Sequence, residues 1–120
     1  MSSLLAELAV VIEGLGLPVV TGVHSENVKG GAGGTYVTMI PMNDILGNYS
    51  DNEPTSETQH VRLSLFWGQY EDGMSPKRRL TRAFLRAGFD ITGRHYVGFD
   101  AGHHHYAIDV AKNYHFDLED

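Results

Sequence analysis

The chain has 120 residues, of which 42% are apolar and 20% are charged. That length and composition predict one folded domain and exclude a mostly disordered chain. Because the chain has no cysteine, it has no disulfide framework, no thiolate metal site and no thiol nucleophile. Its formal net charge of −6 argues against a protein that binds DNA or a membrane surface through its overall charge.

The first residues predict one short helix followed by β-structure. Ser3 is a plausible N-cap for a helix over residues 3–13, where apolar residues recur at helical spacing. Pro18 prevents the helix from continuing, and residues 18–23 and 36–40 are rich in β-prone side chains. Two glutamates interrupt the apolar run before Pro18, so we expect neither a signal peptide nor a membrane span there.

Two polar segments accompany these strands. Residues 29–34 form a glycine-rich stretch that we expect to be a flexible loop, since it lacks the phosphate-loop pattern and opens no helix. Residues 41–58 predict a long polar loop, and a connection of this length is usually functional or forms an arm. Its acidic residues lack the spacing of a calcium loop, so they indicate either a solvated loop or a subunit contact. They are Asp44, Asp51, Glu53 and Glu57.

The second half of the chain has a clearer pattern. Residues 61–67 alternate apolar and polar side chains with a period of two, which predicts a strand. Ser75 followed by Pro76 is typical of a helix start, and the apolar spacing predicts a helix over residues 76–87 with Gly88 as its left-handed cap. Two more strands are expected at residues 91–99 and 104–116, joined by a turn at 100–103.

This order of elements predicts a single α+β domain over residues 1–120, with a short acidic C-terminal tail. We expect a mostly antiparallel sheet of four to five strands with two helices packed on one face. The other face of the sheet should be partly polar, because several strand residues are polar or charged. These are Arg62, Ser64, Asp109 and Lys112. An exposed face and open strand edges favour a protein that needs a partner.

The histidines at the start of the last strand suggest a metal site. On a strand, His103 and His105 point to the same face, and neutral imidazole binds zinc, nickel or copper. A specific site needs three or four convergent ligands, which the sequence does not indicate. The plainer interpretation is a polar turn that enters the strand. The chain also has no GxSxG serine motif, and we expect no catalytic residues and no enzyme activity.

The predicted helix over residues 76–87 carries five cations and no acid. They are Lys77, Arg78, Arg79, Arg82 and Arg86. Four interpretations stay open: a solvated polar face of the helix, a salt-bridge network with acidic segments of the same chain, a complementary contact between two copies, or contact with DNA. The acidic segments available for either kind of ion pairing are residues 44–57 and 117–120.

Short motifs spread over residues 35 to 110 resemble the tail terminator proteins of long-tailed bacteriophages, also called tail completion or tail-to-head joining proteins. The matching stretches are Thr35–Thr38, Asn43–Asp44, Tyr49–Glu53, His60–Phe66, Ala87–Asp90, Tyr96–Asp100 and His104–Val110. The glycine-rich loop and the full histidine run have no counterpart in that family.

The resemblance implies an α+β virion protein without cofactor or catalysis. Such proteins assemble, usually as hexameric rings, at the head-proximal end of the tail tube, where they stop tube polymerisation and dock to the head connector. The implied partners are other copies of the chain, the tube protein and the connector, with no membrane and no specific nucleic acid, although DNA passes through the ring. The implied location is the virion tail, with assembly in the host cytoplasm.

The charged loop, the polar sheet face and the basic helix contain the residues that we expect at an interface. The candidates are Asp44, Tyr49, Asp51, Glu53, Arg62, Arg78 and Arg82. One alternative function is another phage neck or connector adaptor. A different alternative is a small metal- or ligand-binding domain that uses His103 and His105.

Overall fold

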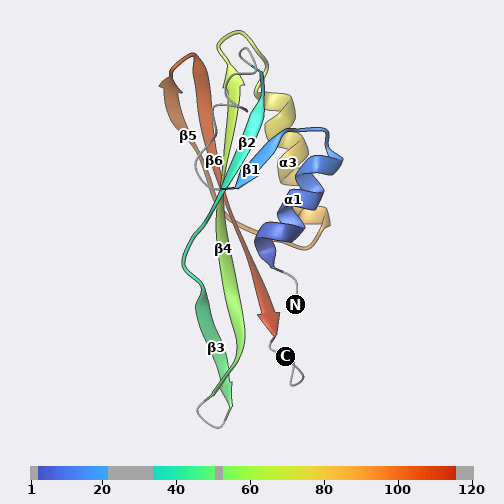
Figure 1. Ribbon diagram of the computed structural model, residues 1–120, viewed down its shortest axis with the longest axis vertical. Coiled ribbons are helices and arrows are strands. Elements are labelled where there is room, and N and C mark those ends of the chain that lie inside the picture. Colours follow the sequence, from blue (N-terminus) through green and yellow to red (C-terminus); the bar gives the residue numbers. More distant parts are fainter. Residues whose placement is uncertain (1–2, 22–33, 51–52, 116–120) are drawn as a thin grey trace.

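The computed structural model describes residues 3–21, 34–50 and 53–115, which form an elongated molecule of 55 × 25 × 24 Å (Figure 1). Its elements in chain order are α1 (Leu4–Gly14), β1 (Val19–Thr21), β2 (Tyr36–Pro41), β3 (Ile45–Ser50), β4 (Glu53–Gly68), α3 (Met74–Arg86), β5 (Asp90–Asp100) and β6 (His103–His115). Two helices and a mostly antiparallel sheet confirm the predicted α+β class.

The strands lie side by side in the order β1-β2-β4-β6-β5, and β3 also pairs with β4. Only β1 and β2 are parallel among the pairs formed by the described strands. The 16-residue strand β4 is the centre of the fold. Its second half pairs with β2 and its first half pairs with β3, so these two strands follow one another along the same side of β4.

Both helices pack on one face of the sheet, as Figure 1 shows. Their buried side chains recur every four residues, which puts them on one stripe of each helix. The helices contribute Leu4, Leu8, Ile12, Leu80 and Phe84 to the core, and the strands contribute Val37, Met39, Val61, Leu63, Leu65, Ile108 and Val110. None of the helices in the described parts of the chain is long and apolar enough to cross a membrane.

The ends of the helices follow the predicted signals with one exception. The Ser3 hydroxyl accepts a hydrogen bond from the Ala6 N–H (3.2 Å), which confirms Ser3 as the N-cap of α1. The prediction that Ser75 caps α3 was wrong, because the helix begins at Met74 with Gly73 as its N-cap. A side chain at position 73 would place its Cβ 2.1 Å from the Trp67 ring, so glycine is the residue that fits here.

The two tight turns of the second half have the expected backbone. Gly88 has φ +87°, and the Phe89 N–H donates to the Phe84 carbonyl (3.0 Å), which confirms the left-handed end of α3. Between β5 and β6, Ala101 and Gly102 have φ values of 52° and 82°. Positive φ at both central residues is the geometry of a two-residue hairpin that matches the twist of its strands.

The prediction of a long loop at residues 41–58 was wrong, because most of this segment is β-structure. Strand β3 pairs with the first half of β4, and residues 111–115 of β6 pair with β4 on its other side. Small polar side chains join the three strands. The Asn113 amide on β6 donates to the Ser56 hydroxyl (3.3 Å) and the Thr58 hydroxyl (3.0 Å) on β4, and the Ser56 hydroxyl donates to the Gly47 carbonyl on β3 (3.4 Å). The strands were not predicted because the segment is mostly polar. The other possibility given for a connection of this length, an arm, is consistent with the observed strands.

Candidate assembly surfaces

The first candidate surface is the arm, which we define as β3 together with the first half of β4, residues 53–60. In Figure 1 the arm extends beyond the helices, at the opposite end of the sheet from the turn between β5 and β6. Its β3 side exposes two large apolar residues, since Ile45 is 58% and Leu46 is 48% exposed. Met42, just before the arm, is 46% exposed. Adjacent exposed apolar side chains on a narrow sheet are typical of a contact with another chain.

The arm is also acidic, with no lysine or arginine between residues 44 and 57. Asp44 is exposed immediately before β3. Glu57 accepts a hydrogen bond from the Gln59 side chain (2.8 Å). Glu53 begins β4 and Tyr49 lies in β3, opposite Pro54, but their side chains are outside the described part of the chain. Asp51 lies outside the described residues altogether.

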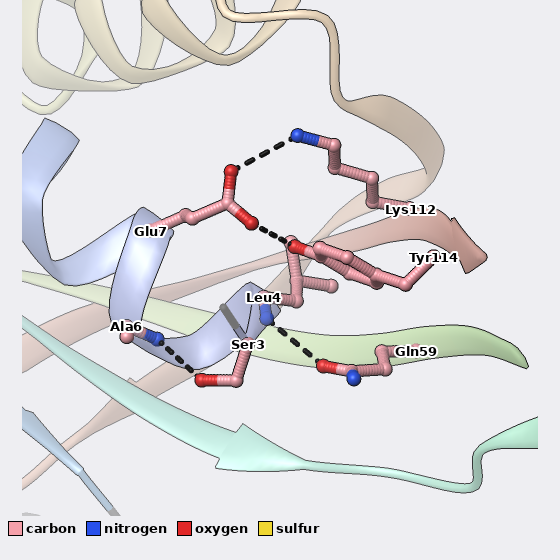
Figure 2. A network of polar contacts seen from close by, with 7 residues as sticks. All are labelled: Ser3, Leu4, Ala6, Glu7, Gln59, Lys112 and Tyr114. Atoms are coloured by element: carbon pink, nitrogen blue, oxygen red, sulfur yellow. Dashed lines mark hydrogen bonds and ion pairs between the residues drawn. The ribbon is translucent and has the colours of Figure 1, made fainter. Parts of the chain in front are cut away.

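A network of polar contacts fixes the root of the arm to α1 (Figure 2). The Glu7 carboxylate on α1 accepts hydrogen bonds from Lys112 (2.9 Å) and from the Tyr114 hydroxyl, both on β6. The Gln59 side-chain oxygen on β4 accepts from the Leu4 N–H (2.9 Å), which satisfies a free donor at the start of the helix. The helix therefore holds the two strands where they leave the core.

The charges in this network shift two pKa values. Burial opposes ionisation of Glu7, but the hydrogen bonds from Tyr114 and Lys112 and the charge of Lys112 outweigh it, so the pKa of Glu7 is below its ordinary value. Burial and the bond to the Glu7 carboxylate raise the pKa of Tyr114. Glu7 is thus held as a carboxylate and Tyr114 as a neutral phenol.

The second candidate surface is the cationic face of α3, which we define by Arg78, Arg82 and Arg86. All three side chains are exposed, and two shallow hollows of about 500 and 430 Å³ lie among them. The exposed apolar residue Leu85 lines the larger hollow. These three arginines make no ion pair with any carboxylate among the described residues.

Other cations near this face are bound within the chain. Arg79 donates to the Leu15 carbonyl (2.6 Å), and Arg94 on β5 donates to the Thr81 hydroxyl (3.2 Å). The Lys77 ammonium lies over the Tyr106 ring, 5.0 Å from its centroid. The basic residues of α3 therefore fall into two groups, one bound to its own chain and one directed outward.

On the sheet face opposite the helices, Arg62 and Asp109 form a cross-strand ion pair. The Arg62 Nε and Nη2 atoms lie 2.7 and 3.0 Å from the two oxygens of Asp109. Hydrogen bonding to Arg62 lowers the pKa of Asp109 although burial opposes the shift. Arg62, predicted as an interface residue, is thus engaged within its own sheet, as a bidentate partner of Asp109.

The same face carries a hollow of about 560 Å³ with aromatic walls. Tyr36, Phe66 and His105 lie opposite one another on three neighbouring strands and stack, with ring centroids 4.9 and 4.4 Å apart. His103 lines the hollow beside them and meets the edge of the Tyr36 ring at 5.5 Å. Stacking across strands explains why an imidazole at position 105 fits an aromatic surface.

The histidine run does not form a metal centre in the described part of the chain. No group of three or more potential ligands converges there. His103 is 7% exposed, and both its ring nitrogens are buried without a hydrogen-bond partner among the described residues. His104 points to the other side, where its Nδ1 lies 2.9 Å from the Tyr96 hydroxyl. The two candidate ligands, His103 and His105, therefore belong to an aromatic surface.

Sequence reasoning missed two features of these surfaces. The exposed pair Ile45 and Leu46 lies inside a polar segment, and this adjacent apolar pair was the available signal for a strand. The link between Glu7 and Tyr114 joins opposite ends of the chain, and no local pattern indicates it.

No protein-family model matches the chain, and no curated protein matches it. Function is therefore inferred from the resemblance of short motifs and from the surfaces described above.

Proposed function

We propose that this chain is a virion structural protein, a tail terminator that assembles as a ring at the head-proximal end of a phage tail tube. It ends tube polymerisation and joins the tail to the head. Its partners are further copies of itself, the tube protein and the head connector, and DNA passes through the ring. The motifs within residues 35–110 support the family, and the surfaces support assembly.

The observation that carries the proposal is the arm. It leaves the region covered by the helices and presents exposed Ile45 and Leu46 on a three-stranded ribbon. A ribbon with so little core of its own gains apolar burial by contact with another chain. A ring closes through a heterologous contact, in which one surface of a subunit meets a different surface of its neighbour. An arm at one end of an elongated subunit suits such a contact.

The test is the mass of the purified protein across a concentration series, followed by electron microscopy of any assemblies. We expect closed rings of defined size at high concentration or on tail tubes. Added to polymerising tube protein, the chain should shorten the tubes, because a bound ring blocks further addition. A protein that stays monomeric and leaves tube length unchanged would contradict the proposal.

The tube assay also distinguishes the related alternative. A neck or connector adaptor would form rings and bind connector protein without changing the length of tubes. Tube length therefore separates a terminator from an adaptor, even when both are ring-shaped.

A further inference from the structure

We infer that the acidic arm of one copy docks on the cationic face of α3 in the next copy. This inference rests on the proposed ring and names the two surfaces that meet in it. Three observations carry it: arginines that have no ion-pair partner among the described residues, the opposite charge of the arm, and apolar residues on both sides.

The arginines need a partner that the described chain does not supply. Arg78, Arg82 and Arg86 follow one another at four-residue intervals and therefore lie along one side of α3. No described carboxylate pairs with them, whereas the two other basic residues of this helix contact their own chain. A row of like charges on one helix is unfavourable until opposite charge is placed against it.

The arm has the complementary charge. Its sequence from residue 44 to residue 57 carries four carboxylates and no cation. Two of them are described, with Asp44 exposed at the start of the arm and Glu57 on β4. Opposite charges on two surfaces speed encounter and fix the register of a contact.

The apolar parts of the two surfaces also match. Leu85 is 58% exposed and lines the hollow formed by Arg78, Arg82 and Arg86. Ile45 and Leu46 are exposed to a similar degree on β3, and because successive strand residues point to opposite faces, one of them at a time can meet Leu85. An apolar centre with a charged rim is the usual anatomy of a specific interface.

The arm of the same chain does not fill this site in the structure. Its strands are fixed by pairing with β4 and β6, and the described arm residues form no ion pair with α3. An arm that docks on the cationic face therefore comes from a second copy, and the contact is heterologous, as a ring requires.

A charge-swap experiment tests the contact. The variant R78E/R82E should weaken self-association about tenfold or more, measured by sedimentation, because it places like charges against the arm. Its melting temperature should stay close to that of the wild type. The variant D44K/E57K should weaken association similarly, and the combination of all four substitutions should restore it. R78K/R82K is the matched control that keeps the charge and should associate as the wild type does.

The possible results separate this inference from the proposed function. Rings that form normally in R78E/R82E would overturn the contact but leave the proposed function standing. A wild-type chain that never assembles, alone or on tubes, would remove the proposed function itself. Equal loss of association and melting temperature in R78E/R82E would assign these arginines to salt bridges within the chain. If the four-residue combination fails to restore association and R78E/R82E loses binding to a short DNA duplex, the face belongs to nucleic acid instead.

Discussion

Glu7 and Tyr114, 107 residues apart in the sequence, are joined by a hydrogen bond between the Tyr114 hydroxyl and the Glu7 carboxylate. The same carboxylate binds Lys112 at 2.9 Å. One residue of α1 therefore contacts β6 at two alternate positions on the same side of the strand, beside the root of the arm (Figure 2). Five predictions rest on this contact and on others described above.

Removing the Glu7 charge should destabilise the fold. In E7Q the amide keeps the shape of the side chain but loses the charged acceptor for Lys112 and Tyr114. We expect the free energy of unfolding to fall by about 1–2 kcal/mol, measured by urea denaturation. E13Q changes the other glutamate of α1 and should have little effect. Equal stability of E7Q and the wild type would mean that water replaces both bonds without loss.

Acid should weaken the fold through Glu7 and Asp109, whose pKa values are both lowered in the folded state. A carboxyl group whose pKa is lower in the folded than in the unfolded protein adds stability at pH values above its unfolded-state pKa. This added stability is lost as the pH falls through the folded-state pKa. The ordinary values are 4.5 for Glu and 3.8 for Asp, so stability should decline below about pH 4.5. The decline should be smaller in E7Q than in the wild type when urea midpoints are compared from pH 7 to pH 3. A steeper decline in E7Q would contradict this sign.

Two glycine-to-alanine substitutions should act in opposite directions. At Gly73 a Cβ would lie 2.1 Å from the Trp67 ring, so G73A should lower the free energy of unfolding by about 1–3 kcal/mol. At Gly14, the last residue of α1, a Cβ meets nothing within 4 Å. G14A should raise stability by about 0.5 kcal/mol, because alanine favours the helix. Thermal or urea unfolding of the two variants checks both signs, and a tolerated G73A would show that the Trp67 ring moves easily.

His103 should be replaceable by an apolar ring. Its two buried nitrogens have no hydrogen-bond partner among the described residues, which costs about 1–3 kcal/mol for such a group. H103F should therefore stabilise the protein by roughly 1 kcal/mol in urea unfolding, with H115F at an exposed position as the control. Loss of stability in H103F would indicate that the imidazole binds a group beyond the described residues.

Zinc should not stabilise the protein. Because the described residues contain no convergent group of three or more ligands, added zinc should leave the melting temperature unchanged. The variant with alanine at positions 103 and 105 should show the same metal affinity as the wild type in a titration. A zinc-dependent rise in melting temperature that this variant lacks would restore the metal site.

The sequence predicted most elements of the fold because their signals were local. The Ser3 side chain caps the start of α1, and the backbone of Gly88 ends α3. The alternation over residues 61–67 indicates a strand with one buried face. The start of α3 was predicted wrongly, since the helix begins after Gly73, a residue whose packing against the Trp67 ring leaves no room for a side chain. Tertiary packing of this kind leaves no local pattern.

The candidate surfaces were predicted less completely. The basic helix was visible in the sequence as a charge imbalance. Only the structure separates Arg79, which donates to the Leu15 carbonyl, from Arg78 and Arg82, which form no ion pair with the described carboxylates. The arm was concealed because its strands hold one another through small polar groups such as Ser56 and Asn113 rather than through an apolar stripe. The interface role of these surfaces stays a prediction.

Strand β4 runs without interruption from the tip of the arm into the core, and no glycine occurs in it before Gly68. The arm therefore continues the core sheet along this strand, and its direction follows the twist of the sheet. In a ring of such subunits, the angle between the arm and the helix layer would affect how many copies close the circle. Ring size would then be encoded in the sheet itself, and changes of backbone twist near residue 60 would alter it.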